Sequence, residues 1–343
     1  MSALSAPLVT SPHSRRWRVF FRQNRARLGL AVLGILLLFS MTAEVWSNHA
    51  PLFLRRDGKN HYPAFGNYTA EDFGVTDSFT VDFKDLVAQD KEMGKDTVVL
   101  FALNRWDPYI QTADVLQGPS RTHWIGTDNL GRDVMARLLY GIRVSLSYGL
   151  LYWLFAYFIG ILVGSVQGYF AGRLDFVLER LKELAEVIPF LSVVILVNGL
   201  TKSQSFFVTL MVVVALGWLG IASQVRAQFL ALRKREFCEA AIALGGGPGR
   251  VIFKHILPNA LTPVLTLTPF AISLGISTLA TLDFLGFGLN PPTPSLGELL
   301  AQGRNYIATA PWLLLAPTVA LALMLISINL VGESLRQAFD PRY

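Results

Sequence analysis

The sequence has little charge. Only 16% of its 343 residues are Asp, Glu, Lys or Arg, while 52% are hydrophobic. Soluble domains usually carry about 25% charged residues, and a soluble fold of this length would need more polar surface than these side chains provide. The shortage of charge therefore excludes an ordinary water-soluble protein and indicates a chain that lies partly in lipid.

Cysteine and catalytic motifs are scarce as well. One cysteine excludes an internal disulfide framework and any multi-cysteine zinc or iron–sulfur site. There is no phosphate-binding loop, because Gln89 stands where the first glycine of a loop ending in Gly94-Lys95 would be. The histidines are scattered along the sequence: His13, His49, His61, His123 and His255. We predict that the chain is not an enzyme, has no catalytic or metal-binding residues and binds no cofactor directly.

Long, predominantly apolar runs are what the chain has instead. A helix that crosses a bilayer needs about 20 mostly apolar residues, and only helices and closed barrels satisfy their backbone hydrogen bonds in lipid. Six such runs occur, at residues 28–46, 144–172, 184–200, 206–223, 255–282 and 305–332. The sequence therefore predicts an all-α polytopic membrane protein with six transmembrane helices.

Two details refine these runs. The first run ends at Glu44-Val45-Trp46, which is a poor cleavage site, so we predict an uncleaved anchor rather than a signal peptide. Pro189, Pro263 and Pro269 lie in the third and fifth runs. Because proline cannot donate a backbone hydrogen bond, we expect these runs to be kinked.

The orientation of the helices follows from the basic residues. Positive charge close to a membrane segment marks the cytoplasmic side. Six arginines and no acidic residue precede the first apolar run: Arg15, Arg16, Arg18, Arg22, Arg25 and Arg27. We predict a cytoplasmic N-terminus, and six crossings bring the C-terminus to the same side. The net charge of +6 then reflects topology and contact with the lipid bilayer rather than a nucleic-acid partner.

The predicted organisation has one sizeable water-exposed part. Within it, Val98 to Phe101 favours a short strand, and residues 130–142 favour an amphipathic helix that leads into the second crossing. The predicted parts are residues 1–27 as a cytoplasmic tail, 28–46 as the first transmembrane helix, 47–143 as a periplasmic domain, 144–332 as a core of five helices with a cytoplasmic loop at 224–259, and 333–343 as a cytoplasmic tail.

The cytoplasmic loop has a pattern of its own. Its apolar residues predict one helix with an apolar stripe: Phe229, Leu230, Phe237, Ala240, Ala241 and Leu244. The run Gly245–Gly249, which contains Pro248, ends that helix. A second helical run follows at 251–257. We interpret the glycine run as a hinge, since no strand precedes it and it does not match a dinucleotide-binding pattern.

Three stretches resemble a known family. Glu239-Ala240-Ala241, Gly245 and Pro258 resemble the EAA loop of the permeases of ATP-binding-cassette (ABC) importers. His255 departs from the broad pattern, where an aliphatic residue is frequent, but fits the His-Ile-Leu-Pro ending of the peptide branch. The second stretch contains Gly126, Thr127, Asp128, Gly131, Arg132 and Asp133, and the third spans residues 283–297. The resemblance covers about residues 120–343.

The region from Pro51 to Asn104 resembles a narrower group, the Yej-type permease subunits. It contains Arg56-Asp57-Gly58 and Glu71-Asp72-Phe73-Gly74 in a long segment after the first crossing. The resemblance implies the type I ABC importer permease fold, the bacterial inner membrane, and uptake of oligopeptides or peptide-like compounds such as microcin C.

The family also implies partners. The segment 239–258 is expected to dock as a coupling helix on separate ATPase subunits, which bind ATP and magnesium. Ala240 and Ala241 would allow close approach, Glu239 would accept hydrogen bonds and Gly245 would permit the turn. A second permease subunit is expected to complete a heterodimer that works by alternating access. A periplasmic substrate-binding protein is expected to dock on the outer domain and the turn 286–304.

Several alternatives stay open. Within the family, the solute could be a dipeptide, nickel or another small solute. A stand-alone carrier or channel would need ionisable residues inside the membrane, and Asp283 lies only at the end of the fifth run. A membrane enzyme or assembly factor would need a cluster in the outer domain. The nearest approach is Asp82, Asp85 and Asp90, whose spacing indicates a solvated helix face.

Overall fold

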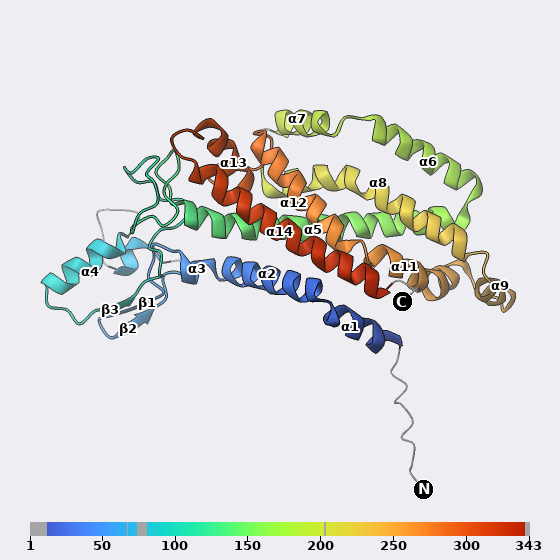
Figure 1. The fold of residues 1–343 in the computed structure, drawn as a ribbon, viewed down its shortest axis with the longest axis horizontal. Coiled ribbons are helices and arrows are strands. Elements are labelled where there is room, and N and C mark those ends of the chain that lie inside the picture. The colour runs from blue at the N-terminus through green and yellow to red at the C-terminus, as the bar shows by residue number, and fades with distance from the viewer. Residues whose placement is uncertain (1–11, 67, 74–80, 202–203, 340–343) are drawn as a thin grey trace, which may run out of the picture.

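The structure, a computed structural model, describes residues 12–66, 68–73, 81–201 and 204–339. It shows a long helical bundle with a small domain at one end (Figure 1). We call the end that carries this domain the outer end and the opposite end, where α9 lies, the inner end. The bundle contains α1 (Pro12–Arg22), α2 (Asn24–Met41), α3 (Ala43–Trp46), α5 (Val134–Phe170), α6 (Gly172–Val187), α7 (Phe190–Thr201), α8 (Phe206–Leu232), α9 (Glu236–Ala243), α10 (Pro248–Arg250), the π-helical turn η2 (Val251–Ile256), α11 (Leu257–Leu265), α12 (Thr268–Phe284), α13 (Leu296–Asn305) and α14 (Trp312–Phe339).

Four described helices are long and apolar enough to cross a membrane, namely α2, α5, α8 and α14. Two further crossings are possible if each of two bent pairs counts as one, so the described residues contain four to six. The first pair, α6 and α7, bends by 78°, and the second, α10–α11 and α12, bends by 57°. Pro189 lies in the break between α6 and α7, and Pro269 lies in the first turn of α12, just after the second bend. Pro263 lies inside α11, three residues before that bend begins. The predicted kinking of the third and fifth runs is confirmed, although α11 continues through Pro263.

Helix α5 is the centre of the bundle and packs most extensively against α8. Glycines four residues apart on α5 make this close approach possible. A Cβ at Gly164 would lie 2.5 Å from the carbonyl oxygen of Ala222, and one at Gly168 would lie 2.5 Å from the Cβ of Phe229. Larger side chains would therefore push α8 away.

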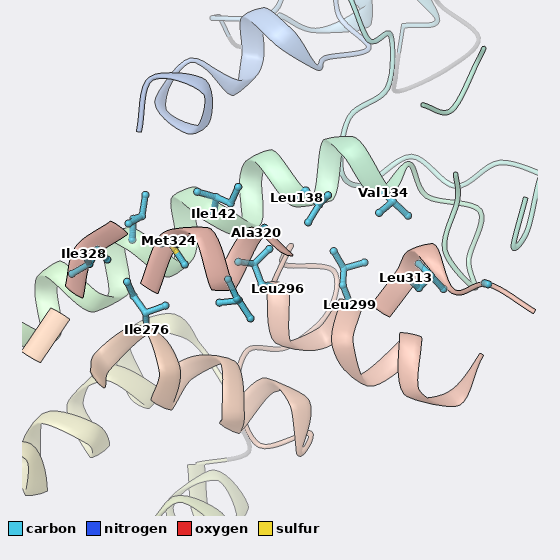
Figure 2. Packing of buried hydrophobic residues seen from close by; sticks show 13 residues of the cluster. Val134, Leu138, Ile142, Ile276, Leu296, Leu299, Leu313, Ala320, Met324 and Ile328 are labelled. Carbon is cyan, nitrogen blue, oxygen red and sulfur yellow. The ribbon is translucent and has the colours of Figure 1, made fainter. Parts of the chain in front are cut away.

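A second contact surface lies toward the outer end, where α5, α12, α13 and α14 meet (Figure 2). Leu138 of α5, Leu299 of α13 and Met324 of α14 are buried there. Helix α13 lies inside the stretch 286–304 that was expected to be a turn, so that expectation is wrong for its second half. Ser295 caps the helix by accepting hydrogen bonds from the backbone N–H groups of Gly297 and Glu298.

The outer domain consists of a small sheet against one helix. Its elements are β1 (Phe53–Arg56), β2 (Lys59–His61), the 3-10 helix η1 (Ala70–Phe73), α4 (Phe83–Glu92) and β3 (Val98–Leu100), with antiparallel strand order β2-β1-β3. The strand predicted near Val98 is confirmed. Leu54, Phe73 and Leu86 form the core between the sheet and the helices.

The predicted solvated aspartate face of α4 is partly wrong. Asp90 is fully buried and forms an ion pair with Arg56 at 2.8 Å. Asp82 instead caps α4, because its carboxylate accepts a hydrogen bond from the N–H of Lys84 at 2.8 Å. Buried charges are paired in folded proteins, and Arg56 lies on β1, 34 residues away in sequence. The spacing of the aspartates could not reveal that partner.

Both ends of the described chain meet at the inner end of the bundle. Phe20 and Ala26 form a small core with Ala338 of α14. Arg25 also lies 3.6 Å from Glu333. Helix α9 projects from the same end (Figure 1). The arrangement agrees with termini on one side of the membrane, and the assignment of that side to the cytoplasm stays a prediction from the arginine bias.

Candidate functional site

The predicted coupling segment consists of α9 and, after the glycine run, α10 and η2, which lead directly into α11. Buried residues of α9 and η2 share a core with the end of α8. The single helix expected from Phe229 to Leu244 is wrong, because α8 ends at Leu232 and α9 begins at Glu236. Arg233 holds the corner by donating a hydrogen bond to the carbonyl oxygen of Tyr169 at 3.0 Å. The break turns α9 back, so that its buried residue reaches the same core as the end of α8.

Cys238 anchors α9 in the molecule. Its side chain is fully buried in a cluster that contains Phe229 of α8, Val251 and Ile256 of η2, and Ala260 of α11. Burial, together with the neighbouring Glu239 carboxylate, raises the pKa of the Cys238 thiol above its ordinary value. The thiol therefore stays protonated and serves in packing, as expected for a lone cysteine.

The other face of α9 is open. Glu239 and Ala240 are exposed, while Ala241 is half-buried against the Cys238 cluster. Among the described residues, Glu239 has no hydrogen-bond or ion-pair partner. Leu244 is 88% exposed and Phe237 is 41% exposed. A surface that combines a free carboxylate, small residues and large apolar side chains is typical of a protein contact.

Gly245 ends α9 by adopting a left-handed backbone conformation, which glycine takes without strain. Its φ is +80°, in the left-handed region. The N–H of Gly246 donates to the carbonyl oxygen of Ala241 at 3.0 Å, and the N–H of Gly245 donates to that of Ile242 at 2.9 Å. These two bonds define a Schellman cap. A Cβ at Gly245 would meet no atom within 4 Å, so the backbone angle alone demands glycine. The predicted end of the helix is confirmed.

His255 and Pro258 lie in and just after an irregular turn. Residues 251–256 form a π-helix, in which the N–H of Leu257 donates to the carbonyl oxygen of Ile252. Pro258 follows in the first turn of α11 and offers no N–H to the preceding turn. Asn259 instead donates its side-chain amide to the carbonyl oxygen of His255 at 2.8 Å. Such π-helical turns are frequent at functional sites.

The second group of predicted residues lies at the outer end. Gly126 and Gly131 have φ of +89° and +72° and shape the loop before α5. Between them, the Asp128 carboxylate accepts hydrogen bonds from the backbone N–H groups of Leu130 and Arg132, both at 2.9 Å. Thr127 contributes through its backbone carbonyl, which accepts a hydrogen bond from the Trp312 indole at 3.1 Å. The loop is thereby fastened to α14.

Three buried charges and the half-buried Glu298 form ion pairs beside the start of α5. Arg132 lies 2.7 Å from Asp128 and 3.1 Å from Glu298. Arg137 forms ion pairs with the same two carboxylates, and its contact with Glu298 is the shorter one. Sequence reasoning did not identify Glu298, which lies 161 residues from Arg137. The one local signal was the Ser295-x-x-Glu298 spacing of a helix start.

Asp133 organises the rest of this group. It caps α5 by accepting a hydrogen bond from the N–H of Ala136 at 2.8 Å, and it accepts another from the Asn104 side chain at 2.8 Å. The His123 Nδ1 lies 2.9 Å from its second oxygen, and both side chains are fully buried. The His123 ring stacks on Trp106 at 4.7 Å. Sequence reasoning missed Asn104 and His123 as partners.

This arrangement fits a structural clamp rather than a catalytic centre. The acids and bases of the outer group pair with one another, and within the part of the chain that the structure describes no three His, Cys, Asp or Glu side chains are placed to hold a metal ion. The structure brings the outer residues together around Asp128 and Asp133. It does not join them to the Glu239–Pro258 segment, which lies at the other end of the bundle (Figure 1).

Comparison with known proteins identifies the family. Residues 156–343 match the family described as the inner membrane component of binding-protein-dependent transport systems. The chain belongs to this family. The inner membrane ABC transporter permease protein YejE of Escherichia coli is 36% identical over 95% of this chain and 96% of its own length. The peptidoglycan transport system permease protein YejE of Agrobacterium fabrum is 34% identical, over 98% and 94%.

Other relatives match a smaller part of this chain. The oligopeptide transport system permease protein OppC of Haemophilus influenzae is 37% identical, over 64% of this chain and 70% of its own. One solved structure, of the MetNI methionine ABC transporter, has a chain with a TM-score of 0.51 at 18% identity, covering 60% of this chain and 97% of that chain. That likeness shows the type I importer fold. The two YejE proteins match nearly the whole permease, which agrees with the resemblance to Yej-type subunits.

Proposed function

We propose that the chain is one of two permease subunits of an ATP-driven importer of oligopeptides or peptide-like compounds. Membership of the family and the names of the YejE and OppC relatives support this proposal. Microcin C-type compounds fall within the proposed range. A dipeptide is the second candidate, because the dipeptide permease DppC of Alkalihalophilus pseudofirmus is 34% identical over 66% of this chain.

The exposed face of α9 is the observation that carries the coupling role. It presents Glu239, Ala240 and the 88% exposed Leu244 at the inner end of the bundle. Burying the Leu244 side chain against a partner contributes about 1.5–3 kcal/mol to the free energy of binding. We infer that this face docks on an ATPase subunit, which holds ATP and magnesium, and that Gly245 to Pro258 complete the docking segment.

The anchoring of α9 explains how a push on it could move the membrane helices. Cys238 ties α9 to α8 and η2 in one buried cluster, so a displaced α9 carries both neighbours with it. Between α9 and α12 the chain contains the π-helical turn η2 and a 57° bend. These irregular places can change conformation with less loss than a straight helix. The proposed result is alternating access between two membrane faces.

The proposed topology has six crossings, each bent pair counting as one. Residues 47–143 then form a periplasmic domain, and both termini and the loop 224–259 lie in the cytoplasm. The arginine-rich segment before α2 and the position of α9 at the same end support this orientation. A second permease subunit and a substrate-binding protein complete the proposed transporter.

The experiment that tests the coupling role changes one exposed alanine. Ala240→Trp should abolish co-purification of the ATPase subunit and uptake of a labelled tripeptide, while membrane insertion stays normal. Ala88→Trp is the matched control for ATPase co-purification, because Ala88 is an exposed alanine on α4 of the outer domain, far from α9. Normal ATPase binding and uptake by the Ala240→Trp protein would show that α9 is not the docking face.

A further inference from the structure

The outer domain contains a cavity that the proposed transport role does not explain. It has a volume of about 360 Å³ and lies between the start of α4 and the segment 105–110. Lys84 and Arg105 line it, together with His49 and the Trp106 ring. A space of this size admits one or two side chains of a partner.

The two cations of the cavity have no acidic partner among the described residues. The Lys84 ammonium lies 4.5 Å from the centre of the Trp106 ring, and the Arg105 guanidinium lies 5.0 Å from that of Phe101. Such contacts hold the cations in place by cation–π attraction without neutralising them. The positive charges therefore stay available to an incoming anion.

The nearby carboxylates are already engaged. Asp82, the one carboxylate among the described residues that line the cavity, accepts hydrogen bonds from the N–H groups of Lys84 and Asp85 as the cap of α4. Asp107 lies 2.5 Å from the Nδ1 of His49. It also accepts from the backbone N–H of Tyr109 at 2.7 Å. Both acids serve the local fold.

The wall of the cavity is fixed to the membrane part. The Trp106 indole donates a hydrogen bond to the carbonyl oxygen of Thr122 at 2.9 Å, and its ring stacks on buried His123. His123 pairs with Asp133, which caps α5. The cavity therefore has a rigid floor connected to the central helix of the bundle, as a recognition site requires.

We propose that this cavity receives a carboxylate-bearing loop of the substrate-binding protein, with Lys84 and Arg105 as the recognition residues. The inference rests on the proposed function, which supplies that partner. Both cations are exposed. Helix α4, which carries Lys84, lies at the end of the molecule farthest from α9 (Figure 1), where a large partner can reach it. Charges in such positions accelerate association and set its salt dependence. A partner protein fits better than a free peptide, because both cations lie on separate segments and are exposed at the surface of the domain, where a protein loop can reach both.

The test measures association of the purified peptide-binding protein with the complete transporter in lipid nanodiscs. Lys84→Glu/Arg105→Glu should lower the association rate at least about tenfold at low salt and should weaken its dependence on salt. The matched control is Lys91→Glu/Arg121→Glu, which makes the same change of charge on exposed residues of the outer domain outside the cavity. Unchanged thermal unfolding midpoints in both proteins show that the fold is intact.

The possible outcomes separate the two levels of the proposal. A lower association rate in the Lys84→Glu/Arg105→Glu protein alone supports the cavity as the recognition site. An equal loss of association rate in both variants shows that the positive charge of the whole domain acts, and it overturns the cavity as the recognition site. An unchanged rate in the cavity variant also overturns the cavity as the recognition site but leaves the proposed function standing. Cavity-dependent binding of a triglutamate peptide without the binding protein overturns the choice of partner. Failure of the wild-type transporter to bind the protein at all overturns the proposed function as well.

Discussion

The two motif-bearing ends of the molecule are built in opposite ways. At the outer end, Asp128, Arg132 and Arg137 are fully buried and pair with one another and with Glu298. At the inner end, Glu239 and its neighbours on α9 are exposed, and one buried thiol holds the helix. The charges around Asp128 pair with one another, whereas the carboxylate of Glu239 on α9 stays without a partner among the described residues.

Under the proposed function, the outer group acts as a scaffold and the exposed face of α9 acts as a docking surface. Buried ion pairs contribute little net stability, but loss of one partner is severe, so they hold a geometry that cannot slip. Displacing an apolar contact such as that of Cys238 costs less free energy, because no buried charge is left without a partner. The paired charges around Asp128 therefore suit a rigid outer end, and α9 suits a segment that moves with the proposed partner. Substitutions at the outer end should mainly lower stability, and substitutions at the inner end should mainly lower transport.

The largest expected effect is at the clamp. Arg137→Met keeps most of the side-chain volume but leaves two carboxylates opposite one arginine in a buried site. The substitution should destabilise the outer end by about 3–5 kcal/mol. Thermal unfolding of the purified protein in detergent measures this loss, which should appear as a lower midpoint and a lower yield of folded protein.

A double substitution tests the reason for that loss. In Arg137→Met/Glu298→Gln, one arginine and one carboxylate disappear together, so Asp128 and Arg132 still balance. The double variant should therefore be more stable than Arg137→Met alone. If it is less stable by the sum of both single changes, the charges do not act as one network.

The next effect is at the end of α9. Gly245→Val places a branched side chain at a φ of +80° and should cost about 1–2 kcal/mol locally. It should also abolish tripeptide uptake, with insertion into the membrane intact. Gly247→Val is the control, since Gly247 has an ordinary φ of −68° and equal space for a Cβ. Equal uptake by both variants would refute a conformational role for Gly245.

The sequence predicted the elements that local composition decides. In lipid, a run of about 20 apolar residues has to be helical, and the runs 144–172, 206–223 and 305–332 correspond to α5, α8 and α14. The end of α9 at Gly245 was predictable for a similar reason, because left-handed backbone favours glycine. Family membership was predictable because three separated motifs occur together.

The features that sequence reasoning missed depend on contacts between distant residues. Glu298 meets Arg137 only because α13 folds back over the start of α5, and Asp90 meets Arg56 only because α4 packs on the sheet. The break before α9 arises because Cys238 packs on the end of α8. The charged residues 233–236 interrupt the apolar stripe at this place, but in sequence they look the same as the solvated face of one continuous helix.

The third prediction concerns how firmly the inner end is held. Cys238 is the single cysteine of the chain and is fully buried, so a maleimide reaches it only when α9 lifts. Labelling should be at least about tenfold slower than for Ala240→Cys in a Cys238→Ala protein, and unfolding in detergent should equalise the rates. Mass spectrometry follows both reactions. Equal rates in the native protein would mean that α9 is not anchored.

The smallest effect is a pH dependence at the outer end, in the Asp107–His49 pair. Burial opposes ionisation of Asp107, but hydrogen bonds from His49 and from the N–H groups of Ile110 and Tyr109 prevail and hold its pKa below the ordinary 3.8. The folded state therefore binds fewer protons than the unfolded state near this pH. The stabilisation is fully present above the unfolded pKa and is lost as the pH falls through the folded pKa. It should amount to about 1 kcal/mol or less, since the pair is partly exposed. Thermal midpoints measured from pH 5.5 down to pH 3 should fall less steeply for Asp107→Asn than for the wild type. Identical slopes would mean that the pair adds nothing to the rigidity that distinguishes the outer end from the inner one.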